Sequence, residues 1–296
     1  MKLKVWFLET RPQFLLLSVV LAFLGTCMAN YDGAFFWWYA VLAFIGLLLC
    51  HISVNVLNDY YDYKSGIDLK TKRTPFSGGS GFLPAAALKP RQVLWFGLTC
   101  FLLAVPIGIY FVFTSGWPLL PLLIVAAICI LLYTPLLTKI GWPEWAPGVG
   151  LGALPVLGAY FVQTGEYTLP AVIASVPSGI LVHNLLLLNE FPDVEADKSA
   201  GRRTLPITIG VKGAGIFYSA LTIILYLWII GWVVAGFMPV FCLIALLTLP
   251  FAALAIRGAL NPEDPSKLMP ALGNNVLVVL VTQLLLGIGY ILAVVI

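Results

Sequence analysis

Two short acidic segments interrupt a chain that is otherwise almost entirely apolar. They cover residues 58–68 and 189–197, and each begins with Asn and places an Asp four positions later. Ionisable side chains near hydrocarbon are costly, and they persist when they pair with cations or face a wet cavity. Two matching sets of carboxylates therefore indicate a positively charged partner and chemistry. The partner we expect is Mg2+ that carries a diphosphate.

Helix geometry places the oxygen atoms of each segment along one edge. At about 100° per residue, side chains four positions apart lie on nearly the same stripe of a helix. Carboxylate and amide oxygens are hard ligands that suit Mg2+, whereas the sequence offers no His and Cys set of the kind that binds zinc. The predicted metal ligands are Asn58, Asp62, Asp68, Asn189, Asp193 and Asp197.

In each segment, one local backbone feature decides where the ligands point. Ser65-Gly66 predicts the end of the first helix, which lets the chain turn Asp68 back toward the other ligands. Pro192 removes a backbone hydrogen bond inside the second helix, so we expect a bend there or a free carbonyl group at Leu188.

Polar and basic residues around the two segments are candidates for substrate contact. Asn55 lies seven positions before Asp62, and a helix face that is polar this far into the membrane favours a cavity over lipid contact. Basic side chains can meet phosphate charge, although juxtamembrane Lys and Arg also serve simply to set membrane orientation. The basic candidates are Lys64, Lys70, Lys72, Arg73, Lys198, Arg202 and Arg203.

The composition requires membrane helices to carry these segments. Of 296 residues, 61% are hydrophobic and 10% are charged, which no soluble fold could bury in one core. The apolar runs are continuous, whereas the strands of a membrane barrel alternate. We expect an all-α polytopic membrane protein, with residues 1–296 forming one domain. Nine spans are predicted, near 14–30, 36–58, 92–113, 117–138, 145–163, 168–189, 213–235, 237–256 and 272–295.

Charge placement predicts the orientation in the cell membrane. With nine spans, all 16 Lys and Arg residues fall in the amino-terminal segment or in the loops after spans two, four, six and eight. The positive-inside rule then places the amino terminus and both acidic segments in the cytoplasm, and the carboxyl terminus outside. The segments lie four helices apart, which suggests duplication of a four-helix unit. The net charge of +3 gives no indication of a nucleic-acid partner.

Taken together, these residues resemble the UbiA superfamily of intramembrane prenyltransferases, over nearly the whole chain. The matches are Asn58-Asp59, Asp62, Asp68, Asp193, residues 197–205, Arg11-Pro12, Tyr133-Thr134-Pro135, Lys139 and Gly141-Trp142-Pro143-Glu144. The resemblance implies nine helices around a central cavity, two Mg2+ ions held by the acidic segments, and an isoprenyl tail in a tunnel open sideways to lipid. It also implies diphosphate contacts for Arg11, Tyr133 and Lys139.

The implied reaction is Mg2+-dependent transfer of an isoprenyl group from a polyprenyl diphosphate to a hydrophobic or aromatic acceptor. The departing diphosphate is stabilised, and the allylic carbocation alkylates the acceptor. The predicted catalytic residues are Asp62, Asp193, Lys139 and Tyr133. The spacing of the first segment and the stretch 74–81 resemble the menaquinone-type branch, which prenylates dihydroxynaphthoate. Geranylgeranyl transfer to a glycerol phosphate, as in archaeal lipid synthesis, and the hydroxybenzoate, haem and chlorophyll branches stay open.

Two further alternatives concern the class of protein and two histidines. A secondary transporter also has many helices and buried acids, but its site usually lies near the membrane midplane, whereas these acids gather at helix ends. His51 and His183 lie within spans two and six, where they could line the cavity as bases. We favour structural hydrogen bonds to a neighbouring helix for both.

Overall fold

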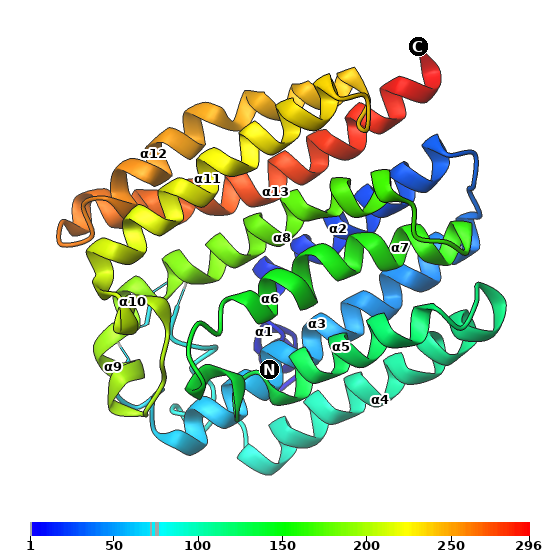
Figure 1. Ribbon diagram of the computed structural model, residues 1–296. Helices are drawn as coiled ribbons and strands as arrows, with labels where there is room; N and C mark the ends of the chain where they lie inside the picture. Colours follow the sequence, from blue (N-terminus) through cyan, green and yellow to red (C-terminus); the bar gives the residue numbers. More distant parts are fainter. Residues whose placement is uncertain (1, 72, 75–76) are drawn as a thin grey trace.

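The computed structural model describes residues 2–71, 73–74 and 77–296. Lys72 and the pair Pro75-Phe76 of the 74–81 stretch lie outside the described residues. Within the described part, every regular element is a helix and no strand occurs (Figure 1). The predicted all-α class is confirmed.

Eight helical segments of the described residues are long and apolar enough to cross a membrane, so the chain is a multi-pass membrane protein. Each overlaps a predicted span; five are single helices, and three join two or three shorter helical elements. The eight segments are Pro12–Tyr31, Trp37–Ser65, Pro90–Thr114, Trp145–Thr164, Leu169–Ser199, Gly210–Val234, Val240–Ala259 and Pro265–Val295.

The labels in Figure 1 follow the chain through these segments and the short elements between them. Along the chain they are α1 Lys2–Glu9, α2 Pro12–Tyr31, α3 Trp37–Ser65, α4 Pro90–Thr114, α5 Leu119–Leu132, η1 Leu137–Lys139, α6 Trp145–Gly148, η2 Val149–Ala153, α7 Leu154–Thr164, α8 Leu169–Asn189, η3 Phe191–Asp193, α9 Val194–Ser199, α10 Leu205–Thr208, α11 Gly210–Val234, η4 Val240–Thr248, α12 Leu249–Ala259 and α13 Pro265–Val295. The element η2 is one turn of π-helix.

The fourth predicted span, 117–138, is shorter than expected. It contains α5, a helix of 14 residues, which covers about 21 Å at the α-helical rise. The hydrocarbon core of a bilayer is roughly 30 Å thick. The count of nine spans therefore stays a prediction, and so does the duplication of a four-helix unit.

The helices pack side by side in a way that leaves the acidic segments at one end. Helices α11, α12 and α13 lie along one side and α3, α4 and α5 along the other, with α2, α7 and α8 between them (Figure 1). The loop after α3 lies at the same end as α9 and α10. Gly25 allows the close approach of α2 to α7, since a Cβ there would lie 2.3 Å from the Val156 carbonyl oxygen.

Candidate active site

The two acidic segments meet at one end of a single cavity of about 350 Å3. Its lining combines a polar end, built from α3, the following loop and α8–α9, with a longer apolar part. All six predicted metal ligands line it: Asn58, Asp62, Asp68, Asn189, Asp193 and Asp197. The predicted substrate contacts Arg11, Asn55, Tyr133 and Arg202 line it as well.

The first segment follows the predicted course. Helix α3 ends at Ser65, and Gly66 adopts the left-handed conformation with φ 80°, as expected for a helix C-cap. The turn brings Asp68 to the cavity, where its carboxylate lies against Gly79. Burial, followed by the nearby Asp62 and Asp59 carboxylates, raises the pKa of Asp68 to about 7. The nearby Arg11 and Arg202 side chains lower the pKa of Asp68, but by less than burial and these carboxylates raise it.

The second segment crosses a helix break. Helix α8 ends at Asn189, a 3-10 turn spans Phe191–Asp193, and α9 begins at Val194. The interruption predicted at Pro192 is confirmed. The Asn189 Oδ1 atom is buried and has no hydrogen-bond partner, and the Ser77 hydroxyl donates to Asp193 Oδ1 at 3.3 Å. The loop after α3 therefore contacts the second segment as well as the first.

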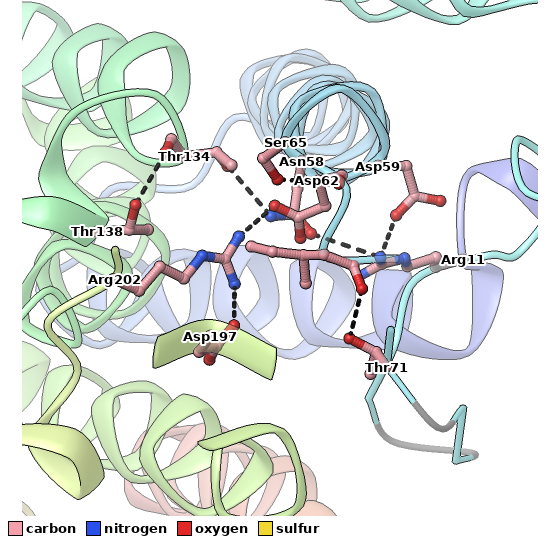
Figure 2. A network of polar contacts seen from close by, with 11 residues as sticks. Arg11, Asn58, Asp59, Asp62, Ser65, Thr71, Thr134, Thr138, Asp197 and Arg202 are labelled. Carbon is pink, nitrogen blue, oxygen red and sulfur yellow. Dashed lines mark hydrogen bonds and ion pairs between the residues drawn. The ribbon is translucent and has the colours of Figure 1, made fainter. Parts of the chain in front are cut away.

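Arg202 joins the two segments directly. Its guanidinium forms ion pairs with Asp62 on α3 and with Asp197 on α9, the latter at 2.8 Å (Figure 2). Burial alone would lower the pKa of Arg202, but the Asp62 and Asp197 carboxylates raise it above its usual value. A guanidinium group held between the segments in this way is suited to bind a phosphate and to neutralise part of its negative charge.

Arg11 holds the other side of the first segment. It precedes α2 in a left-handed conformation with φ 54°, and its side chain pairs with Asp59 and lies 3.4 Å from Asn58 Oδ1 (Figure 2). Asp59 also accepts a hydrogen bond of 2.8 Å from the Ser80 backbone N–H. Asp59 is thus buried behind the cavity wall and held by Arg11, while Asn58 faces the cavity and donates to Thr134 Oγ1 at 3.1 Å.

Two buried glutamates were not predicted as parts of the site. Glu9 is fully buried and accepts a hydrogen bond of 2.6 Å from the Ser80 hydroxyl. Burial, and secondarily the Asp59 carboxylate, raises the pKa of Glu9 to about 7. Glu144 is also fully buried and accepts from the Leu205 backbone N–H at 2.6 Å. An acid two positions before Arg11, and an acid inside a Trp-Pro motif, were the available signals.

Several predicted phosphate contacts lie outside the cavity lining. Lys139 and Lys198 are exposed, and the exposed Lys70 donates to Ser199 Oγ at 3.5 Å. The exposed Arg73 packs its side chain against Gly81. Arg203 acts through its backbone, because its N–H donates to the Thr138 carbonyl at 2.8 Å. Their roles toward a phosphate stay predictions, and Lys139 in particular is not brought beside Tyr133 at the cavity.

Both histidines make structural hydrogen bonds, but only His51 bonds to a neighbouring helix as we expected, because the partner of His183 lies in the loop between η1 and α6. His51 Nδ1 and the Ser18 hydroxyl on α2 are 2.8 Å apart. The Trp142 indole N–H donates to His183 Nε2 at 2.9 Å. His51 also contributes to the cavity lining, but its ring nitrogen is engaged with a neighbouring helix.

The donor set fits Mg2+ bound together with a phosphate. Among the described residues, no three acidic, His or Cys side chains are grouped so that they could hold a metal ion by themselves. Asp62 and Asp197 pair with Arg202. Mg2+ uses one or two carboxylates and completes its shell with water and substrate phosphate oxygens. Asn189 Oδ1, buried and unpartnered, is an available hard ligand of this kind.

Comparison with known proteins places this site in a family. Residues 18–294 match the UbiA prenyltransferase family. The chain belongs to that family. The resemblance inferred from the acidic segments is confirmed, the chain is classed as an intramembrane prenyltransferase, and the transporter alternative is removed. It is 30% identical to 1,4-dihydroxy-2-naphthoate octaprenyltransferase of Bacillus subtilis (strain 168), over 90% of this chain and 85% of the relative.

Solved structures of this family share the fold. A UbiA homologue from Archaeoglobus fulgidus, bound to GPP and Mg2+, aligns with a TM-score of 0.65 at 14% identity, over 99% of this chain and 100% of that one. A digeranylgeranylglyceryl phosphate synthase aligns with a TM-score of 0.69 at 17% identity, over 98% and 99% of the two chains. The helical arrangement is therefore the family's arrangement.

Proposed function

We propose that this prenyltransferase transfers a polyprenyl group from its diphosphate to 1,4-dihydroxy-2-naphthoate or a related aromatic quinone precursor, with Mg2+ as cofactor. One observation carries the proposal: two carboxylate-rich helix ends meet at the polar end of a cavity whose remainder is apolar. An amphipathic substrate with a diphosphate head and a hydrocarbon tail matches this division. The 30% identical relative that carries the naphthoate name supports the acceptor.

The polar residues of the cavity would bind the metal ion and the diphosphate. Asn58, Asp62 and Asp68 from one side, and Asn189, Asp193 and Asp197 from the other, would hold Mg2+. When bound, Mg2+ would neutralise the departing diphosphate and so ease cleavage of the allylic carbon–oxygen bond. Arg11 and Arg202 would bind remaining phosphate oxygens.

Tyr133 and Asn55 would act on the organic part of the substrates. Both line the cavity, and Asn55 is fixed by a hydrogen bond of 3.1 Å from its Nδ2 to the Thr10 carbonyl oxygen. They can orient the acceptor or the first carbons of the prenyl group relative to the diphosphate. The apolar walls would exclude water, which otherwise competes with the acceptor for the carbocation.

We also propose the predicted orientation, with the amino terminus and the diphosphate end of the cavity in the cytoplasm, and one domain over residues 1–296. The positive-inside distribution supports the orientation. Labelling of single cysteines introduced at Lys64 and at Gly236 with a membrane-impermeant reagent tests it. Labelling of the Gly236 position from outside intact cells, and of the Lys64 position only after lysis, is expected; the reverse pattern overturns it.

The test of function uses purified protein with geranylgeranyl diphosphate, Mg2+ or EDTA, and separate acceptors. Dihydroxynaphthoate, hydroxybenzoate and geranylgeranylglyceryl phosphate are compared, with diphosphate release and the lipid product both measured. We expect a prenylated naphthoate that forms with Mg2+ and not with EDTA. A product with the glycerol phosphate instead would move the chain to the lipid-synthesis branch, and turnover in EDTA would remove Mg2+ from the proposal.

A further inference from the structure

A second cleft opens on the surface of the molecule, where α1 meets the first turns of α4. Helix α4 lies at an edge of the helix bundle (Figure 1). The side chains that line the cleft come from these two helices and the residue before α4; they are Trp6, Lys89, Arg91, Gln92, Trp95 and Phe96. The lining of the central cavity contains none of the six. The cleft is therefore separate from the candidate active site.

The position of the cleft along α4 places it at a membrane surface. Helix α4 begins at Pro90, and its 25 residues cover about 37 Å, more than the roughly 30 Å of the hydrocarbon core. On α1, Leu3 and Phe7 are 85% and 61% exposed. They lie four positions apart, on one stripe of the helix. A short helix with an exposed apolar stripe is suited to lie in the membrane interface, so the cleft faces lipid.

Aromatic rings form the apolar part of the cleft. The Trp6 ring of α1 packs edge-on against Phe96 of α4, with centroids 5.2 Å apart. Trp95, which lines the same cleft, is 55% exposed. Tryptophan rings favour the level of the lipid headgroups, because they are apolar and still carry one N–H donor. These rings are therefore suited to contact the glycerol part and the first chain carbons of a lipid.

Two unpaired cations form the charged part of the cleft. Lys89 and Arg91 are exposed, and within the described part of the chain neither side chain forms an ion pair or a hydrogen bond. Arg91 lies four positions before Trp95, so the two share one stripe of α4. By contrast, Arg11 and Arg202 at the central cavity each pair with an aspartate. The cleft therefore offers two uncompensated positive charges beside an apolar surface.

We propose that this cleft binds one anionic phospholipid, with the phosphate group at Lys89 and Arg91 and the glycerol and first chain carbons against Trp6 and Trp95. Basic side chains at a membrane surface attract anionic lipids, and the apolar rings select a lipid over a free phosphate ion. A zwitterionic lipid brings an ammonium group that the two cations repel. The bound lipid contacts both helices and so holds α1 against α4. The inference does not depend on the proposed reaction.

The experiment compares lipids with identical chains on delipidated protein in a neutral detergent. Dioleoyl phosphatidylglycerol, dioleoyl phosphatidylcholine and inorganic phosphate are added separately, bound lipid is counted by native mass spectrometry, and the unfolding temperature is recorded. The test variant is Lys89→Gln/Arg91→Gln. Its matched control is Lys212→Gln/Arg257→Gln, which also removes two exposed cations, from α11 and α12, outside the cleft and the cavity lining. Trp95→Ala tests the apolar part without a change of charge.

We expect the wild type and the control to retain one phosphatidylglycerol and to gain unfolding temperature with it. Loss of Lys89 and Arg91 should weaken this binding about thirtyfold, and Trp95→Ala should weaken it about tenfold. Trp95→Ala decides the matter if the double variant does not fold.

Three results overturn the inference. The first is equal retention of phosphatidylglycerol by the wild type and the cleft variants. The second is phosphatidylcholine bound as tightly as phosphatidylglycerol, which would show an apolar groove without selection for charge. The third is displacement of the lipid by an equal concentration of inorganic phosphate, which would show a phosphate site that makes no use of the rings.

Discussion

The first acidic segment lies on a continuous helix, whereas the second crosses a break between two helices. Asn58 and Asp62 share one face of α3, and only Asp68 depends on a turn. Asn189 closes α8, Asp193 closes a 3-10 turn, and Asp197 lies on α9. The same spacing of Asn and Asp is thus carried by different backbones, and both deliver oxygen atoms to one cavity. The two segments are therefore similar in their side chains and not in their local structure.

The two segments also differ in how they are tied to the rest of the chain. The first is held by Arg11 through Asp59 and by Arg202 through Asp62. In the second, Asp197 pairs with Arg202, and Asp193 accepts a hydrogen bond from the Ser77 hydroxyl. Arg202 links the two segments through these ion pairs. A substitution in one segment should therefore alter the position or charge balance of the other.

The largest expected effect comes from removing a central carboxylate of either segment. We expect Asp62→Asn and Asp193→Asn each to reduce prenyl transfer by about a thousandfold, because each removes negative charge that would hold Mg2+ against the diphosphate. The purified variants are assayed with Mg2+ for product formation. Glu195→Gln is the control, since Glu195 is exposed on the same short helix α9 as Asp197. Near-normal transfer by either aspartate variant would show that the reaction does not require that segment's carboxylate.

The next effect concerns the link between the segments. Arg202→Gln leaves Asp62 and Asp197 buried without their cation, which costs on the order of 3 kcal/mol of folding free energy for a broken buried pair. We expect a lower unfolding temperature in detergent and weaker diphosphate binding. Arg257→Gln, at an exposed position on α12 away from the cavity lining, should change neither by a comparable amount. An Arg202→Gln protein of unchanged stability and diphosphate affinity would contradict the linking role.

Restoring a regular helix in the second segment should have a smaller effect. Pro192→Ala supplies the missing N–H and allows α8 to continue, which would rotate Asp193 and Asp197 relative to Asn189. Misplacement of reacting groups by about an ångström lowers rates by up to a hundredfold, and we expect a loss between about tenfold and a hundredfold with little change in unfolding temperature. Pro177→Ala lies in the middle of the same helix α8 and is the control. Equal losses in both variants would argue against a special role for the break.

The smallest effect lies in two turns, one at Gly66 inside the first segment and one at Gly201 after the second. Gly66 and Gly201 have φ values of 80° and 77°, and a Cβ at either would meet no atom within 4 Å. Alanine therefore meets only the backbone penalty of the left-handed conformation, about 1 kcal/mol at each position. We expect Gly66→Ala and Gly201→Ala to lower the unfolding temperature by similar amounts. A much larger loss in one variant would mean that its turn carries strain beyond the glycine itself.

Much of the fold follows from local signals in the sequence. Continuous apolar runs locate the long helices, Gly66 ends α3, and Pro192 interrupts the second segment, since each depends on the covalent properties of a few neighbouring residues. The length of α5 was misjudged because apolar residues continue through 117–138 whether or not the backbone stays helical there. The runs therefore locate helices better than they measure them.

The sequence predicted which acidic and amide side chains line the polar end of the cavity, but not their contacts with one another. Regular spacing indicates which oxygens share a face of one helix, but the meeting of Arg202 with Asp62 joins positions 140 residues apart. The burial of Glu9 likewise depends on Ser80, in a loop that folds back from α3. Lys139 was predicted to be catalytic from the family resemblance, yet it is exposed and outside the cavity lining, because exposure is decided by packing, which the local sequence does not contain.

The central claim is that the two segments act as one site on one diphosphate. A double-mutant cycle with Asp62→Asn and Asp193→Asn tests it directly, with binding of an unreactive geranylgeranyl thiodiphosphate measured by calorimetry in the presence of Mg2+. We predict that the double variant binds about as weakly as the weaker single variant, because groups that act as a unit give non-additive losses. Losses that multiply, so that the free-energy changes add, would show two independent sites and contradict the account.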